Sequence, residues 1–252
     1  MAKRHSKDRF RSTRKQGREP EGYLQHTTEP LQNLLFLLPL LAVFHVGVWV
    51  WDIHDYPEYP LRVLLGWFGV TTSLLGPLLV VGVLLGQHVA RGDPWTLRPW
   101  TWAGMLGEAI LWTLPLLAVQ YLRNLAAAGD LAASMPAGSQ FWRQVVFYIG
   151  TGIYEEFVFR LVLISLVMLL LVDLGGLGET VSAVTAVAVS AVLFALAHFG
   201  IPGVWEGAEF SWARMGFLIP AGALWGGLMA FRGFGIAVAS HAAWNVLHLL
   251  IS

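Results

Sequence analysis

Two adjacent glutamates, Glu155 and Glu156, lie inside a long apolar stretch of the sequence. Ionisable side chains are costly at membrane depth, so they mark a candidate functional site. On a helix, two neighbours point about 100° apart, so we expect the two carboxylates to do different jobs. Glu156 and Arg160 are spaced i and i+4, which predicts an ion pair on one helix face. Glu155 has no such local partner, which makes it the candidate general base.

Two further apolar segments carry histidines at helical spacing. His198 follows Phe194 by four residues, and His241 precedes Asn245 by four. His241 and Asn245 share a helix face, and both can donate a hydrogen bond to the oxyanion of a tetrahedral intermediate. We expect Glu155, His198, His241 and Asn245 to meet at one site.

Structural interpretations compete with this one. The glutamates fit an ion-paired packing cluster or a proton relay. His241 and Asn245 fit hydrogen bonds between helices. A single histidine at a membrane boundary, such as His198, is commonly an interfacial residue, and the chain has other histidines in or near apolar segments: His45, His54, His88 and His248.

The composition is that of a membrane protein. Of 252 residues, 56% are hydrophobic and 13% are charged, whereas soluble domains carry roughly 25% charged residues. There is no cysteine, which excludes disulfides and a thiol nucleophile. Residues 1–30 hold eight of the sixteen lysines and arginines and are predicted to be a disordered cytoplasmic tail. Its basic run is interpreted as a topology signal rather than a site for anionic lipid, and no nucleic-acid partner is predicted.

Hydropathy predicts an all-α fold, a polytopic membrane helix bundle of about seven transmembrane helices, with six to eight allowed. We expect residues 31–142 to form the N-terminal transmembrane helices and residues 143–252 to form the catalytic core. The basic tail with Arg91 and Arg98 favours a cytoplasmic N-terminus and a multi-pass protein of the cell (inner) membrane. Arg123 and Arg143 argue mildly against that orientation. The predicted spans are 33–51, 63–87, 104–122, 143–171, 181–199, 212–231 and 234–251.

The candidate residues resemble the motifs of one protein family. Glu155-Glu156-xxx-Arg160, Phe194-xxx-His198 and His241-xxx-Asn245, in this order on successive membrane helices, look like those of the CPBP family. This family comprises the type II CAAX prenyl endopeptidases and their bacterial relatives, also called Abi proteins. The resemblance covers residues 143–251, so the core 143–252 is CPBP-like, and the tail and first three spans match no family.

The resemblance implies an intramembrane protease of the glutamate type. Glu155 would activate water with help from His198, and His241 and Asn245 would form the oxyanion hole. Glu156, Arg160 and Phe194 would support the site. No cofactor is favoured. Glu155, His198 and His241 could bind zinc and leave an open water position. This mechanism ranks second, because His241 one turn before Asn245 suits a hydrogen-bond donor as well as a ligand, and the sequence has no HExxH motif.

The implied substrate is a membrane-anchored or lipidated protein in the lipid bilayer, cut near its C-terminus or its membrane segment. Two other classes of function stay open. One is a non-catalytic CPBP-fold scaffold or peptide-immunity protein, although all three motifs are complete. The other is a proton-coupled transporter, which the lack of an inverted repeat between the two halves disfavours.

Overall fold

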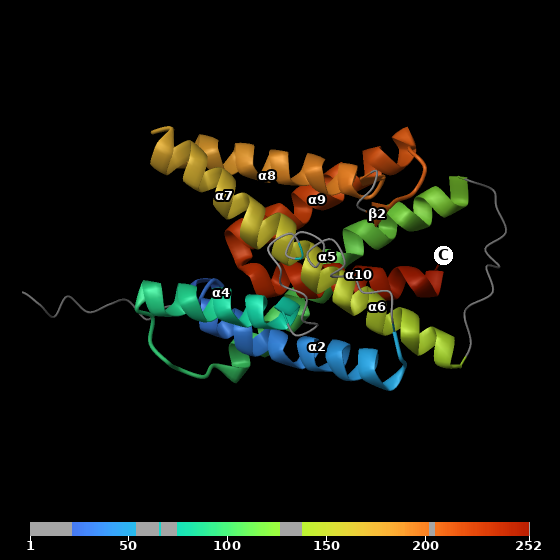
Figure 1. The fold of residues 1–252 in the computed structure, drawn as a ribbon, viewed down its shortest axis with the longest axis horizontal. Coiled ribbons are helices and arrows are strands. Elements are labelled where there is room, and N and C mark those ends of the chain that lie inside the picture. The colour runs from blue at the N-terminus through green and yellow to red at the C-terminus, as the bar shows by residue number, and fades with distance from the viewer. Residues whose placement is uncertain (1–21, 54–65, 67–74, 127–137, 202–204, 252) are drawn as a thin grey trace, which may run out of the picture.

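The computed structural model describes residues 22–53, 66, 75–126, 138–201 and 205–251 of the chain. Helices dominate this part (Figure 1). The N-terminal half contains α1 (Tyr23–His26), α2 (Pro30–Val50), α4 (Leu75–Arg91) and α5 (Pro99–Ala126). The C-terminal half contains α6 (Ser139–Glu156), η1 (Phe157–Ile164), α7 (Ser165–Met168), η2 (Leu169–Leu174), α8 (Glu179–Ala197), α9 (Trp212–Arg232) and α10 (Phe234–Ile251), with the short strands β1 (Gly200–Ile201) and β2 (Trp205–Glu206) after α8.

The all-α membrane bundle is confirmed. Within the described residues, five helices are long and apolar enough to cross a membrane: α2, α5, the continuous helix Ser139–Leu174, α8 and α9. The apolar helices α4 and α10 are shorter than these. Each of the seven predicted spans overlaps one of these helices, although most of the first half of the predicted span 63–87 lies outside the described residues. The antiparallel pair β1–β2 was not predicted.

The prediction that residues 1–30 form a disordered tail is wrong for its last part. Residues 22–29 include helix α1, and the side chains of His26, Thr27 and Glu29 are buried. His26 Nδ1 lies 2.8 Å from Glu29 Oε1, and Asn33 donates to the Thr27 carbonyl at 2.9 Å. The polar groups bond one another instead of water, so this segment is packed against the bundle. Residues 1–21 lie outside the described part.

Helix Ser139–Leu174 changes its winding next to the glutamates. It is α-helical up to Glu156 and continues as a π-helix over Phe157–Ile164. A second π-helical segment covers Leu169–Leu174. Segments of π-helix are rare and occur often at functional sites. At 1.5 Å per residue, Glu155 lies roughly 24 Å from the start of this long helix, near its middle.

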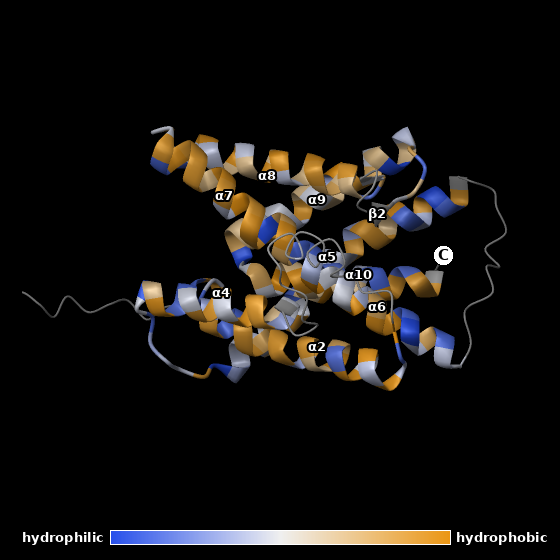
Figure 2. Cartoon of the chain, in the orientation of Figure 1, coloured by the Kyte–Doolittle hydropathy of each residue, from blue (hydrophilic) through white to orange (hydrophobic). Residues whose placement is uncertain are grey.

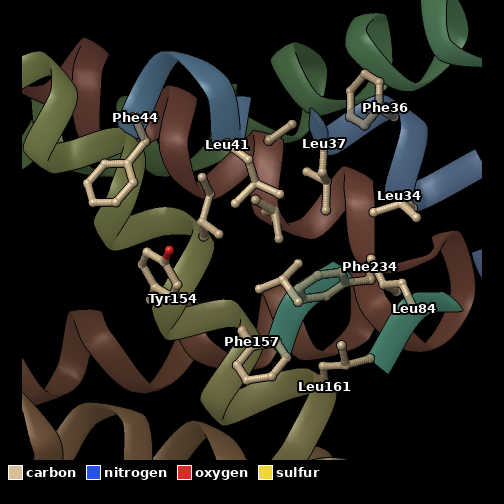
Figure 3. Close-up of a cluster of buried hydrophobic side chains, with 14 of the residues drawn as sticks. Leu34, Phe36, Leu37, Leu41, Phe44, Leu84, Tyr154, Phe157, Leu161 and Phe234 are labelled. Carbon is tan, nitrogen blue, oxygen red and sulfur yellow. The ribbon is translucent and has the colours of Figure 1, made fainter. Parts of the chain in front are cut away.

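Helix α10 is the centre of the bundle. It packs against α5, α6, α9 and α2, while α8 pairs with α9. Figure 1 shows α6 and α10 between α2 and α4 on one side and α8 and α9 on the other. One hydrophobic cluster joins α2, α4, α6 and α10 and includes Phe44, Tyr154 and Phe157 (Figure 3). A second cluster, around Phe194 and Trp225, joins α8, α9 and α10.

Many large apolar side chains point outward. On α5 they include Leu106 and Leu111, and on α8 they include Val184 and Val192. Figure 2 shows hydrophobic residues along the outer faces of the helices, whereas hydrophilic residues gather at helix ends and in the middle of the bundle. A soluble monomer rarely exposes contiguous apolar surface of this extent, so the outer faces are suited to lipid.

Candidate active site

Glu156 is the fully buried member of the glutamate pair. Its side chain is 0% exposed, and its Oε1 lies 3.3 Å from Nη1 of the equally buried Arg160. The predicted i, i+4 pair is therefore present. The Arg160 Nη2 also donates to the Gly222 carbonyl of α9 at 3.2 Å. The pair thus ties the π-helical segment to α9.

Glu155 points to a different set of partners. Its side chain is 24% exposed, and its Oε2 lies 3.6 Å from Nε2 of His241. Its Oε1 lies 3.9 Å from Nε2 of His198. Glu155 pairs with residues of α8 and α10 rather than with its own helix. The structure therefore brings together Glu155, His198 and His241, which are 43 to 86 residues apart in the chain.

One imidazole contacts both glutamates. The Nδ1 of His241 lies 2.8 Å from Glu156 Oε1, and its Nε2 faces Glu155. An ionised carboxylate can only accept a hydrogen bond, so ionised Glu156 fixes a proton on Nδ1. Glu156 thereby orients His241, and the Nε2 of a neutral His241 is left unprotonated toward Glu155.

His198 caps the C-terminus of α8. Its Nδ1 donates to the Phe194 carbonyl at 2.9 Å, because a carbonyl oxygen can only accept. The Nε2 of neutral His198 is therefore an acceptor that faces Glu155. The 3.9 Å between them exceeds a direct hydrogen bond and suits a bridging water.

Phe194 supports both sides of the site. It is buried, and the Arg160 guanidinium lies 4.2 Å from its ring centroid. Its ring also meets the edge of His198, with 4.6 Å between ring centroids. Phe194 thus contacts both the buried ion pair and the half-buried His198.

Asn245 lies one turn beyond His241, as the motif requires, and it is buried. Its Nδ2 donates to the Tyr148 carbonyl of α6 at 3.3 Å. This contact is a hydrogen bond between helices, which the sequence analysis gave as the alternative to an oxyanion-binding role for Asn245. One amide hydrogen of Asn245 is not needed for this contact.

A glycine brings α6 and α10 close enough for these contacts. A Cβ added at Gly152 would lie 2.7 Å from the backbone nitrogen of Ala242, which is closer than real side chains approach. Gly152 stands one turn before Glu155 and Glu156, and Ala242 follows His241. The close crossing of the two helices thus places the glutamates beside the histidine.

Trp225 is a site residue that the sequence interpretation missed. The side chain, from α9, is buried and stacks on His241, with 3.7 Å between ring centroids and 13° between ring planes. Helix α9 supplied no predicted site residue. The sequence did contain a signal: Trp225 lies inside its predicted span and not at an end. This position is unusual, because tryptophans of membrane proteins are enriched at the two membrane–water interfaces.

The candidate zinc ligands are not arranged as a preformed metal site in the described residues. Across the part of the chain that the structure describes, no group of three or more histidine, aspartate or glutamate side chains is arranged to hold a metal ion. Glu155, His198 and His241 would be the ligands, but their present spacing is not that of a coordination shell.

The family comparison covers the whole of this site. Residues 137–247 match the model of the Rce1-like family, described as type II CAAX prenyl endopeptidase. This segment is therefore similar to that family. The Rce1-like segment begins at the start of α6 and contains all seven residues predicted from the motifs. No curated protein and no solved structure matches the chain.

Proposed function

We propose that the protein is an intramembrane endopeptidase that hydrolyses a peptide bond of a lipidated or membrane-anchored protein, near its C-terminus or its membrane segment. One observation carries the proposal: near the middle of a membrane-spanning helix, Glu155 faces the Nε2 atoms of two histidines that come from two other helices. The Rce1-like segment supports a proteolytic activity of this kind.

In the proposed mechanism, a water molecule lies between Glu155 and His198. Glu155 takes one proton from this water as its oxygen attacks the scissile carbonyl carbon. A tetrahedral intermediate forms, and its oxyanion takes hydrogen bonds from the Asn245 amide and from Nε2–H of His241, which has taken up this proton from bulk water before the reaction and keeps it throughout the cycle. Protonated Glu155 then gives its proton to the leaving amine, the C–N bond breaks, and the carboxylate is regenerated.

Glu156 and Arg160 are assigned a supporting role. Glu156 orients His241 through the contact with Nδ1, and the contact with Arg160 holds Glu156 in position. In the second mechanism, Glu155, His198 and His241 would hold a zinc ion, which would lower the pKa of a bound water. These three side chains would have to move closer together to bind it.

For the location, we propose the cell (inner) membrane with a cytoplasmic N-terminus. The basic segment precedes α2 in the sequence, and the end of the bundle at which α2 starts carries Arg91, Arg98 and Arg232. The opposite end carries Arg123, Arg143 and Arg214. The excess of positive charge marks the first end as cytoplasmic.

The decisive experiment compares Glu155→Gln with wild type in reconstituted membranes. New termini on membrane-anchored proteins of the same cell would be read by mass spectrometry. We expect Glu155→Gln to slow cleavage by about 100-fold or more, as for loss of a general base. Glu179→Gln, which changes an exposed glutamate at the start of α8, is the matched control.

Two outcomes would change the assignment. If a broad panel of substrates shows no terminus that depends on Glu155, the protein is a non-catalytic member of the family fold, such as a scaffold or immunity protein. If cleavage depends on Glu155 and is lost with a zinc chelator and restored by zinc, the metal mechanism replaces the glutamate mechanism.

A further inference from the structure

The face of α8 that carries Phe194 and His198 continues toward the start of the helix. Ser190 precedes Phe194 by four residues and His198 by eight, so the three side chains follow one face. Helix α8 packs along η1, α7 and η2 of the long helix Ser139–Leu174 (Figure 1). Ser190 is fully buried. The row of residues that brings His198 to Glu155 therefore includes a buried hydroxyl.

The hydroxyl of Ser190 forms a hydrogen bond to another helix. Its Oγ donates to the Phe159 carbonyl of the π-helical segment η1 at 2.7 Å. Thr151, Ser165 and Thr185 behave differently, because each donates to the carbonyl four residues earlier in its own helix. A bond of that local kind is the ordinary one for a hydroxyl inside a helix. Ser190 thus links α8 to the π-helical segment.

The accepting carbonyl lies beside the groups that support the active site. Phe159 precedes Arg160, whose guanidinium contacts Glu156 and the Gly222 carbonyl. The ring of Phe159 meets the ring of Phe194 edge to face, with 5.5 Å between ring centroids. The bond from α8 therefore holds η1 next to both the buried ion pair and the aromatic residue that touches it.

A hydrogen bond fixes two helices in a way that apolar contacts do not. Apart from two serines, the buried residues of α8 are alanines and Phe194. Apolar contacts have no preferred direction, whereas a hydrogen bond requires a defined distance and angle. His198 lies two turns beyond Ser190, with its Nε2 3.9 Å from Glu155 Oε1. A shift of α8 along η1 would change this separation, which suits one bridging water.

We infer that Ser190 is a positioning residue: its bond to the Phe159 carbonyl fixes α8 on the π-helical segment and thereby sets the separation of His198 and Glu155. The effect on rate rests on the proposed protease function. Ser190 contacts no reacting group and acts through His198. Serine hydroxyls from neighbouring helices satisfy backbone groups where a membrane helix departs from α-helical winding, which explains a polar residue at this place.

The first test removes the hydroxyl and measures cleavage of a substrate that depends on Glu155. Ser190→Ala should lower kcat about tenfold, because small misplacements of reacting groups are costly. KM should stay within twofold of the wild-type value, since a loss of stability alone would not reduce kcat selectively. Ser190→Cys keeps a weaker donor of similar size and should give an intermediate kcat.

Ser182→Ala is the matched control. Ser182 lies eight residues before Ser190 on the same face of α8 and is also fully buried. Its Oγ has no hydrogen-bond partner among the described residues. The control variant should keep the wild-type kcat. A wild-type kcat in Ser190→Ala, or an equal loss in the two alanine variants, overturns the positioning role.

A double variant tests whether Ser190 acts through His198. In a His198→Ala background, Ser190→Ala should lower kcat by less than twofold further, because the group that it positions is already absent. Two losses that multiply would show that the serine acts independently of the histidine and would overturn the inference.

Hydrogen exchange of the full chain in nanodiscs tests the contact without catalysis. Ser190→Ala should speed amide exchange in η1 about fivefold or more, while Ser182→Ala should leave it unchanged. Unchanged exchange in Ser190→Ala overturns the role of the hydroxyl even where no substrate is cleaved. Failure of the protease function is read separately, from the lack of termini that depend on Glu155.

Discussion

His241 stacks face to face on Trp225, with 3.7 Å between ring centroids and 13° between ring planes. The indole fixes the plane of the imidazole, and Glu156 fixes its rotation through the contact of 2.8 Å with Nδ1. The Nε2 of His241 is thereby held toward Glu155. Helix α9 supplies no reacting group, but it positions one.

The stacking contact predicts a graded response to substitution of Trp225. Trp225→Phe keeps an aromatic face and should retain most of the cleavage rate, whereas Trp225→Ala opens a cavity beside His241. Removal of a buried tryptophan side chain costs about 3–5 kcal/mol of folding stability. Cleavage rate and thermal unfolding should both be measured. A Trp225→Ala variant with the wild-type rate and stability would contradict the positioning role of Trp225.

The buried pair Glu156–Arg160 should show strong coupling. Arg160→Met leaves the Glu156 carboxylate buried without its cation, and breaking such a pair costs about 3–5 kcal/mol. The double variant with Glu156→Gln removes both charges and should be more stable than Arg160→Met alone. Unfolding of the wild type, both single variants and the double variant gives the coupling energy. Additive effects in this cycle would contradict the pairing.

The close crossing at Gly152 predicts sensitivity to one methyl group. Gly152→Ala places a Cβ 2.7 Å from the Ala242 nitrogen, so α6 and α10 must separate. The glutamates then move away from His241, and the cleavage rate should fall more than tenfold. Gly82→Ala is the control, because a Cβ there meets no atom within 4 Å. Equal rates in the two variants would show that the crossing does not position the site.

The segment before α2 should respond to alkaline pH. Burial raises the pKa of Tyr23 to about 12, with a further contribution from Glu108, while Arg232 opposes the shift. The folded state therefore holds the Tyr23 proton more tightly than the unfolded state, whose pKa is near 10. Its contribution to stability is complete below pH 10 and is lost as pH rises toward 12. An ultraviolet pH titration of wild type and Tyr23→Phe should differ by one tyrosine titrating near pH 12; a difference near pH 10 would refute the shift.

The proposed orientation is accessible to cysteine labelling, because the chain contains no cysteine. With a cytoplasmic N-terminus and seven spans, Ser139 at the start of α6 lies on the outer side. A membrane-impermeant maleimide added to intact cells should label Ser139→Cys but not Ser6→Cys. Permeabilised cells should label both. The reverse pattern in intact cells would invert the topology.

The sequence alone determined the features that depend on local spacing. A 3.6-residue repeat puts Glu156 and Arg160 on one face, and the structure has that pair at 3.3 Å. Long apolar runs predicted helices because backbone groups in lipid must bond within their own segment. The three short motifs likewise identified the segment that matches the Rce1-like family.

Contacts between helices were decided by the tertiary structure. The place of Trp225 against His241, the Asn245 contact with Tyr148 and the crossing at Gly152 depend on which faces meet, and no spacing within one helix specifies that. The same holds for residues 22–29. Their polar composition predicted disorder, but their partners are Gln32 and Asn33 on α2, Arg91 at the end of α4 and Arg98 between α4 and α5. Helix geometry fixes neighbours within a segment, whereas side-chain packing selects neighbours between segments.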